Sequence, residues 1–287
     1  MSTASEPLRV TFVGRASEVG HAVPSAAVGG LRPSFVEHRA NHAAARLLAH
    51  VAEHDPQLVV VFGAASVPAA AVRAIDVPVV AWTTAPDRPP GLAHHPDLPS
   101  ASPKFVAGQA SAGDYDHAID HPLPVADERF AAPRWSPGGP RALVIGHSSP
   151  RAERLLVDSK HRHELLHVAS GLRGDALAAV LAAADVAIDV RDDDAPGFGP
   201  RAALYLAAGL LLVSEPLQPS HGLCAGEDHV EIRDSAALVD LLARVRAGPA
   251  EFTAIREAGR EAAEAFRASL VYPRLLAPLA GVAAAAG

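Results

Sequence analysis

The chain has 287 residues, of which 49% are hydrophobic and 20% are charged. This length suits two domains, and this hydrophobic content excludes wholesale disorder. A net charge of −7 excludes a protein that binds nucleic acid through a basic face. The longest apolar run, 204–213, is about half of a membrane span, and no leader sequence is evident, so we expect a cytoplasmic protein without a membrane span.

Apolar, β-branched segments in the first half predict buried strands separated by helices. The strands are expected at 8–13, 58–62 and 77–82, with a loop over 14–33 and helices over 34–54 and 67–75. The pattern dissolves over 83–111, and 115–120 is expected to form one more short strand. Strands that alternate with helices at this spacing predict an α/β architecture with a parallel sheet.

The segment 131–140 contains too much Pro and Gly for the interior of a helix or strand, so it is expected to be a linker. After it the α/β pattern resumes. The strands are expected at 142–145, 165–169, 186–190 and 210–214, and helices from Pro150 and over 175–183, 201–208, 235–246, 250–270 and 271–280. We therefore expect two domains, 1–132 and 141–267, joined by a linker at 133–140, with a C-terminal helix over 268–287 that packs back on the first domain.

Several segments resemble one family of enzymes in the order of their features. They are Asp175–Asp189, Gly197–Glu215, Gly226–Ile232 and the helix from Ser235, together with 58–87 and 114–119 in the first half. Their order resembles GT-B glycosyltransferases of the family-1/4 type, and within these the bacterial spore-maturation (CgeB-like) proteins. The resemblance implies an α/β GT-B fold, with two Rossmann-like domains facing each other across a cleft. It also implies transfer of a sugar from a nucleotide-sugar donor to a small-molecule or polymer acceptor.

The expected donor site consists of two glycine-bearing loops that each follow a strand and open a helix. Such loops bind phosphate through free N–H groups and the positive end of the helix dipole. The candidates in the loops are Gly146, Ser148, Gly197, Phe198 and Gly199. Arg151, Arg154 and Arg201 are the candidate partners of the diphosphate, because a guanidinium group can bind two oxygens at once. The alternative interpretation is ordinary strand-to-helix turns with solvated arginines.

Three residues are candidates for the chemistry of transfer. Asp87 follows the strand that ends near Trp82, and His94 lies in the Pro-rich segment at the expected cleft. Either could serve as a base toward an acceptor hydroxyl. His147 follows the first strand of the second domain and could donate to a phosphate. The alternatives are a turn-capping aspartate and surface histidines. Neither a metal nor a cofactor other than the donor is expected.

The chain departs from the family at one important place. Retaining relatives carry two glutamates eight positions apart, whereas Pro196 and Leu204 occupy these positions here. Neither side chain can accept a hydrogen bond. This departure favours an alternative function, a catalytically inactive protein that binds a ligand or a partner, and a partner protein or homodimer is left open. A third alternative is a sugar-nucleotide epimerase or hydrolase.

Two clusters have the spacing of metal ligands. His38, His42, His50 and His54 fall on one predicted helix as two pairs four residues apart, which is typical of zinc ligands. Asp192, Asp193 and Asp194 carry oxygen ligands suited to Mg²⁺. In both cases a solvated surface is the preferred interpretation.

Overall fold

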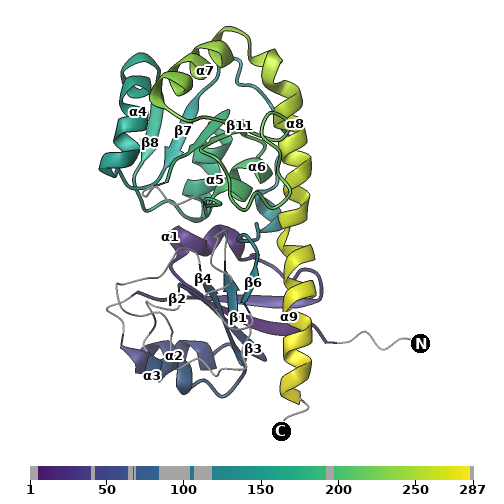
Figure 1. Cartoon of the computed structure of the whole chain (residues 1–287). Coiled ribbons are helices and arrows are strands. Elements are labelled where there is room, and N and C mark those ends of the chain that lie inside the picture. Colours follow the sequence, from purple (N-terminus) through teal and green to yellow (C-terminus); the bar gives the residue numbers. More distant parts are fainter. Residues whose placement is uncertain are drawn as a thin grey trace, which may run out of the picture. The chain divides into compact units, whose positions relative to one another are not determined.

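The computed structural model describes residues 6–39, 43–63, 67, 69–83, 104–106, 118–191 and 197–284. The chain divides into two compact units, one formed by 1–128 together with 266–287 and the other by 129–265. Each unit is built around its own parallel β-sheet (Figure 1). Each unit can therefore be described by itself.

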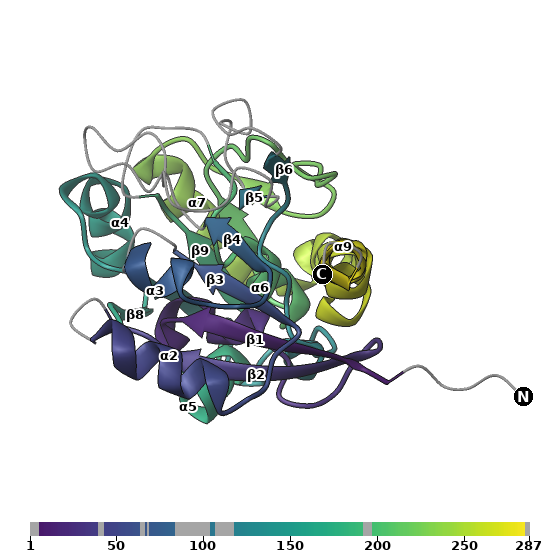
Figure 2. The same ribbon diagram turned by 90° about the horizontal axis from the view of Figure 1, so that it is seen from below.

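The sheet of the first unit has six strands in the order β2-β1-β3-β4-β5-β6, and every neighbouring pair is parallel. Figure 2 shows these strands one above another, from β2 to β6. The strands are β1 (Leu8–Gly14), β2 (Leu31–Glu37), β3 (Leu58–Phe62), β4 (Val79–Thr83), β5 (Lys104–Val106) and β6 (Ala118–Asp120). Because the chain winds in opposite directions on the two sides of β1, this order is that of a Rossmann-like, doubly wound sheet.

Helices cover both faces of this sheet, which explains why its strand β3 is uniformly apolar. Leu58 and Val60 of β3 belong to a core that includes Tyr272 of helix α9 (Ala268–Ala284). Val59 and Val61 point to the opposite core, formed with α2 (Ala44–Ala52) and α3 (Ala69–Arg73). The buried Tyr272 hydroxyl donates a hydrogen bond of 2.8 Å to the carbonyl of Ala22. The C-terminal helix is thus part of the core of the first unit. Among its described residues, this unit also contains the short elements α1 (Ala16–Val19), η1 (Gly20–Ala22) and η4 (Asp127–Arg129), the last of which runs into the second unit.

The sheet of the second unit has five parallel strands in the order β11-β10-β9-β7-β8. They are β7 (Ala142–Ile145), β8 (Leu165–Val168), β9 (Val186–Asp189), β10 (Leu211–Ser214) and β11 (Val230–Glu231). The helices are α4 (Pro150–Arg162), α5 (Gly174–Ala182), α6 (Ala202–Ala207), α7 (Ser235–Ala247) and α8 (Thr253–Ala262), with the 3₁₀ turns η5 (Pro249–Phe252) and η6 (Ala263–Phe266). The core on one face lies between the sheet and helices α4 and α7. No helix within the described residues is both long and apolar enough to cross a membrane.

The pattern of apolar residues predicts most strands closely, and 58–62 and 142–145 are confirmed residue for residue. Three strands were not predicted from the pattern: β2, β5 and the two-residue β11. Residues 31–37 form β2 instead of a loop and the start of a helix, because all seven of them pair with β1 and Pro33 is tolerated on an edge strand. Residues 104–106 form β5, a strand of three residues that is too short to leave a pattern. The helix expected over 250–270 is divided by the turn η6.

Candidate functional site at the carboxyl edge of the second sheet

Three neighbouring strands of the second unit end at one edge of the sheet. They are β10, β9 and β7, which end at Ser214, Asp189 and Ile145. The direction of winding reverses between β7 and β9, so this is the topological switch point, where open α/β sheets bind ligands. Both predicted glycine loops, at Gly146 and at Gly197–Gly199, begin at this edge. Both glycine segments thus lie at the same edge of the sheet, and the side chains there decide its chemistry.

The loop after β7 leads into a well-capped helix. The Ser149 hydroxyl accepts a hydrogen bond of 3.1 Å from the backbone N–H of Ala152, and Pro150 is the first residue of α4. This cap satisfies one of the N–H groups that a helix start leaves without a partner. His147 and Ser148 are exposed just before the cap. The start of α4 therefore presents the positive end of a helix of 13 residues at this edge.

Ser148 forms a hydrogen bond with a side chain of helix α4. Its hydroxyl donates to Glu153, whose carboxylate also lies 2.6 Å from the Nζ atom of Lys160. The hydrogen bonds from Lys160 and Ser148 lower the pKa of Glu153. Arg154 is exposed. Ser148 and Arg154 thus belong to the rim of the site.

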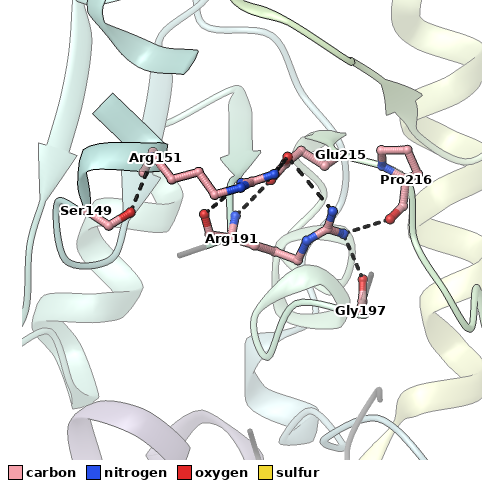
Figure 3. A network of polar contacts seen from close by, with 7 residues as sticks. Ser149, Arg151, Arg191, Gly197, Glu215 and Pro216 are labelled. Carbon is pink, nitrogen blue, oxygen red and sulfur yellow. Dashed lines mark hydrogen bonds and ion pairs between the residues drawn. The ribbon is translucent and has the colours of Figure 1, made fainter. Parts of the chain in front are cut away.

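The centre of the edge is a network in which two arginines converge on one carboxylate (Figure 3). Arg151, in the first turn of α4, donates from both terminal nitrogens to Glu215, which directly follows β10. The same guanidinium donates a 3.0 Å bond to the carbonyl of Arg191. The backbone N–H of Arg191 in turn donates to the Glu215 carboxylate at 3.0 Å. The network thus links the segments that follow β7, β9 and β10.

The charge of Glu215 is held by its partners. The side chain is only 7% exposed, and burial by itself would raise the pKa of its carboxyl group. The hydrogen bonds from Arg151 and from the N–H of Arg191, together with both positive charges, outweigh that effect and lower the pKa. Glu215 is therefore ionised at neutral pH and binds both arginines as a carboxylate.

Arg191 also holds the second glycine loop in place. Its Nη1 atom donates to the carbonyls of Pro216 at 2.8 Å and of Gly197 at 3.4 Å (Figure 3). Its Nη2 atom lies 3.9 Å from the Glu215 carboxylate. One side chain therefore connects the end of β10 with the start of the Gly197–Gly199 segment.

Gly199 lies directly against a buried carboxyl group. A Cβ atom at this position would overlap the carboxylate oxygens of Asp189, the last residue of β9. Burial raises the pKa of Asp189 to about 6, although the charges of Arg201 and Arg191 act in the opposite direction. Phe198 is buried and meets the ring of His221 edge-on, with the centroids 5.0 Å apart. Glycine at 199 is thus required by this close approach.

Leu204 belongs to the hydrophobic core. Helix α6 is buried along its whole length, and Leu204 itself is fully buried. A glutamate here would place a charge among apolar groups, so the leucine agrees with its surroundings. Tyr205, next to it, is also buried, and burial raises the pKa of its hydroxyl group. The position that matches the second family glutamate therefore serves packing in this chain.

Several predicted residues fall outside the described residues, namely His42, Asp87, His94, Asp192, Asp193, Asp194 and Pro196. His38 contradicts the expectation of one histidine-bearing helix, because it follows strand β2 while α2 begins at Ala44. Within the part of the chain that the structure describes, no group of three or more metal-ligating side chains occurs. His50 and His54 line a surface hollow of about 350 Å³ beside α2, together with Glu37, Glu53, Arg39 and Arg46.

The fold can be compared with known proteins on this basis. No protein-family model matches the chain, and no curated protein matches it either. Solved structures do match over nearly the whole chain. HepE of Anabaena in complex with UDP-glucose has a TM-score of 0.60 at 12% identity and covers 96% of this chain and 100% of its own. Sucrose-phosphate synthase from Thermosynechococcus elongatus has a TM-score of 0.58 at 12% identity, with the same coverage. A glycosyltransferase from Rickettsia africae has a TM-score of 0.58 at 10% identity and covers 95% of this chain and 97% of its own.

The fold is GT-B. At identities of 10–12% the likeness extends to the fold, and the chemistry depends on the residues of the chain itself. The GT-B fold agrees with the two Rossmann-like units and confirms the fold class expected from the sequence.

The sequence analysis missed three residues that shape this site. Asp189, Arg191 and Glu215 were not assigned a role, although each lies at or just after the end of a predicted strand. A charged residue in that position was the available signal, because the carboxyl ends of parallel strands meet at one edge. Only the structure shows that the chain brings Arg191 and Glu215 to Arg151.

Proposed function

We propose that the protein is a glycosyltransferase that moves a sugar from a nucleotide-sugar donor to a small-molecule or polymer acceptor. The observation that carries the proposal is the GT-B fold over the whole chain, shared with a HepE structure that holds UDP-glucose, in combination with an arginine network at the switch point of the second sheet. A catalytically inactive binding protein is the less favoured alternative.

The second unit is proposed to bind the donor. The diphosphate lies against the helix start after Gly146 and the Gly197–Gly199 loop, where backbone N–H groups and the helix dipole favour an anion. Three guanidinium groups act on two carboxyl groups at this edge: Arg151 and Arg191 bind Glu215, and the charges of Arg191 and Arg201 act on Asp189. The edge is therefore positively charged on balance, which supports an anionic ligand. The remaining donor-binding assignments, Ser148, Arg154 and Phe198, lie around this centre.

The first unit is proposed to bind the acceptor. During transfer, the bond between the anomeric carbon and the diphosphate oxygen breaks, and a new bond forms to the acceptor hydroxyl oxygen. The hydroxyl proton passes to a base, for which Asp87 and His94 are the candidates. The arginines and His147 stabilise the negative charge that develops on the departing diphosphate. Cationic side chains serve the diphosphate in this proposal, so it assigns no role to a metal ion.

Three finer expectations stay predictions. The similarity to spore-maturation (CgeB-like) glycosyltransferases rests on the order of segments such as Gly197–Glu215 and Gly226–Ile232. A cytoplasmic location and a partner protein or homodimer are equally predictions from the sequence.

Calorimetry with UDP-, GDP- and dTDP-sugars tests the proposal. We expect one of them to bind, and the Arg201→Ala variant to bind it more weakly. Arg233→Ala is the matched control, because Arg233 is exposed and lies in the same unit. Incubation of the bound donor with and without candidate acceptors then shows the reaction: transfer requires an acceptor, whereas epimerisation or hydrolysis does not. Absence of binding to every donor would overturn the proposal.

A further inference from the structure

The Arg151–Glu215–Arg191 network contributes little to stability for the free energy that the desolvation of its charges requires. A buried ion pair must compensate the desolvation of its charges, and apolar residues often fill the same place at least as well. Here the Arg151 and Glu215 side chains are 19% and 7% exposed. Arg151 stands at the start of a helix and at the switch point of the sheet, where ligands of this fold class bind. The network therefore lies where binding of a ligand can explain why its charges are kept.

The contacts of Glu215 show what it does to its neighbours. Its carboxylate accepts hydrogen bonds from both terminal nitrogens of Arg151, and this bidentate contact fixes the plane of that guanidinium. It also accepts the backbone N–H of Arg191, which fixes the segment that follows β9. Arg191 then reaches the carbonyl of Gly197. One carboxylate thus determines the positions of an arginine, a loop and the start of the second glycine segment.

We propose that Glu215 is the positioning residue of the donor site, which holds Arg151 and the Gly197 loop in the geometry that binds the diphosphate. This inference rests on the proposed function. It assigns to Glu215 no contact with the donor; the carboxylate acts through Arg151 and Arg191.

The alternative is that Glu215 is a competing anion that occupies Arg151 until the donor displaces it. The two roles predict opposite signs. Removal of a competing negative charge would tighten the binding of an anion, whereas removal of a positioning residue weakens it. The hydrogen bond from the backbone N–H of Arg191 favours the positioning role. If the donor displaced the Glu215 carboxylate from Arg151, this bond would also break and the segment after β9 would lose its partner.

Glu215→Gln tests the sign, since it keeps the size of the side chain and removes its charge. We expect the Kd for UDP, or for the nucleoside diphosphate that the wild type binds, to increase about tenfold or more. The Kd for inorganic pyrophosphate should increase similarly, whereas the Kd for the corresponding nucleoside, which has no phosphate, should not change. A purely structural role would weaken nucleoside and diphosphate equally. Circular dichroism and thermal unfolding establish that the variant is folded.

Two further variants keep the test decisive. Glu231→Gln removes a carboxylate from an Arg–Glu pair at the end of β11 and should leave every Kd unchanged. Glu215→Asp keeps the charge and should recover part of the diphosphate affinity. This variant still tests the inference if Glu215→Gln folds poorly. Unchanged or tighter diphosphate binding by Glu215→Gln would overturn this inference alone. A wild-type protein that binds neither nucleotide nor pyrophosphate would overturn the proposed function as well.

Discussion

Two of the arginine–carboxylate clusters in the second unit lie at opposite edges of the same sheet. Asp185 and Arg256 lie at the amino edge, where Asp185 directly precedes β9. Glu215 and Arg151 lie at the carboxyl edge. The side chains of Asp185 and Arg256 are 1% and 3% exposed, whereas those of Glu215 and Arg151 are 7% and 19% exposed. The amino-edge cluster is sealed from solvent, whereas the carboxyl-edge cluster is partly exposed.

The partners of the two clusters explain the difference. Asp185 accepts the backbone N–H groups of Ser136 and Arg141 at 2.8 and 3.0 Å, so it binds the linker to the sheet. Arg256 lies over the ring of Trp135 at 4.5 Å and donates to the carbonyl of Gly209. All these partners are structural. A buried ion pair is therefore no sign of function by itself; its edge of the sheet and its remaining partners decide which role it has.

We expect the largest loss of unfolding free energy when the amino-edge cluster is broken. Asp185→Asn leaves the buried Arg256 without its carboxylate, so we expect the free energy of unfolding to fall by about 3 kcal/mol. Urea unfolding measures the change. Asp240→Asn, at an exposed position of α7, is the control and should have little effect. Donor binding by the folded Asp185→Asn protein should equal that of the wild type, and a selective loss of donor affinity would contradict the structural role.

The next prediction concerns the carboxyl edge. Gly199→Ala places a methyl group on the Asp189 carboxylate, which must move together with the loop. We expect a loss of about 2 kcal/mol in unfolding free energy, and a weaker affinity for the donor. Gly138→Ala is the control, because a Cβ atom there meets open space. Unchanged donor affinity in a destabilised Gly199→Ala protein would show that the loop serves packing only.

The amino-acid pattern predicts the sheets better than the site. Uniformly apolar, β-branched segments such as Leu58–Phe62 are typical of buried strands, so they are found directly. Strand β2 was missed because Pro33 and its polar neighbours conceal an edge strand whose partner, β1, lies about 20 residues earlier. Its pairing is a tertiary effect that local pattern does not contain.

The same limit applies to the site. Gly146, Gly199 and Arg151 could be predicted because glycine loops and arginines after strands have a local signature. Glu215 could not, since its role depends on Arg151, 64 residues earlier in the chain, and on the backbone N–H of Arg191. Leu204 likewise becomes understandable only when helix α6 is seen to be buried.

The pH dependence of stability sharpens the comparison further. The pKa of Asp189 in the folded protein is about 6, above its ordinary value of 3.8. The folded state therefore binds the proton more tightly than the unfolded state, and the cost of burying the charge is complete above pH 6 and declines as the pH falls. Asp189→Asn removes this cost. Relative to the wild type, the variant should gain about 1 kcal/mol more unfolding free energy at pH 8 than at pH 5. A gain that does not depend on pH would contradict a buried, titrating carboxyl group.

The smallest expected effect belongs to a third arginine–glutamate pair. Arg233 and Glu231 meet at 3.2 Å after strand β11, but the arginine side chain is 83% exposed. Water screens this pair, so Glu231→Gln should change the unfolding free energy by less than about 0.5 kcal/mol. The same substitution chemistry at Glu215 removes a carboxylate that holds three chain segments. If the two variants had equal effects on stability and on diphosphate binding, neither burial nor position at the switch point would distinguish the pairs, and the assignment of a role to Glu215 would fail.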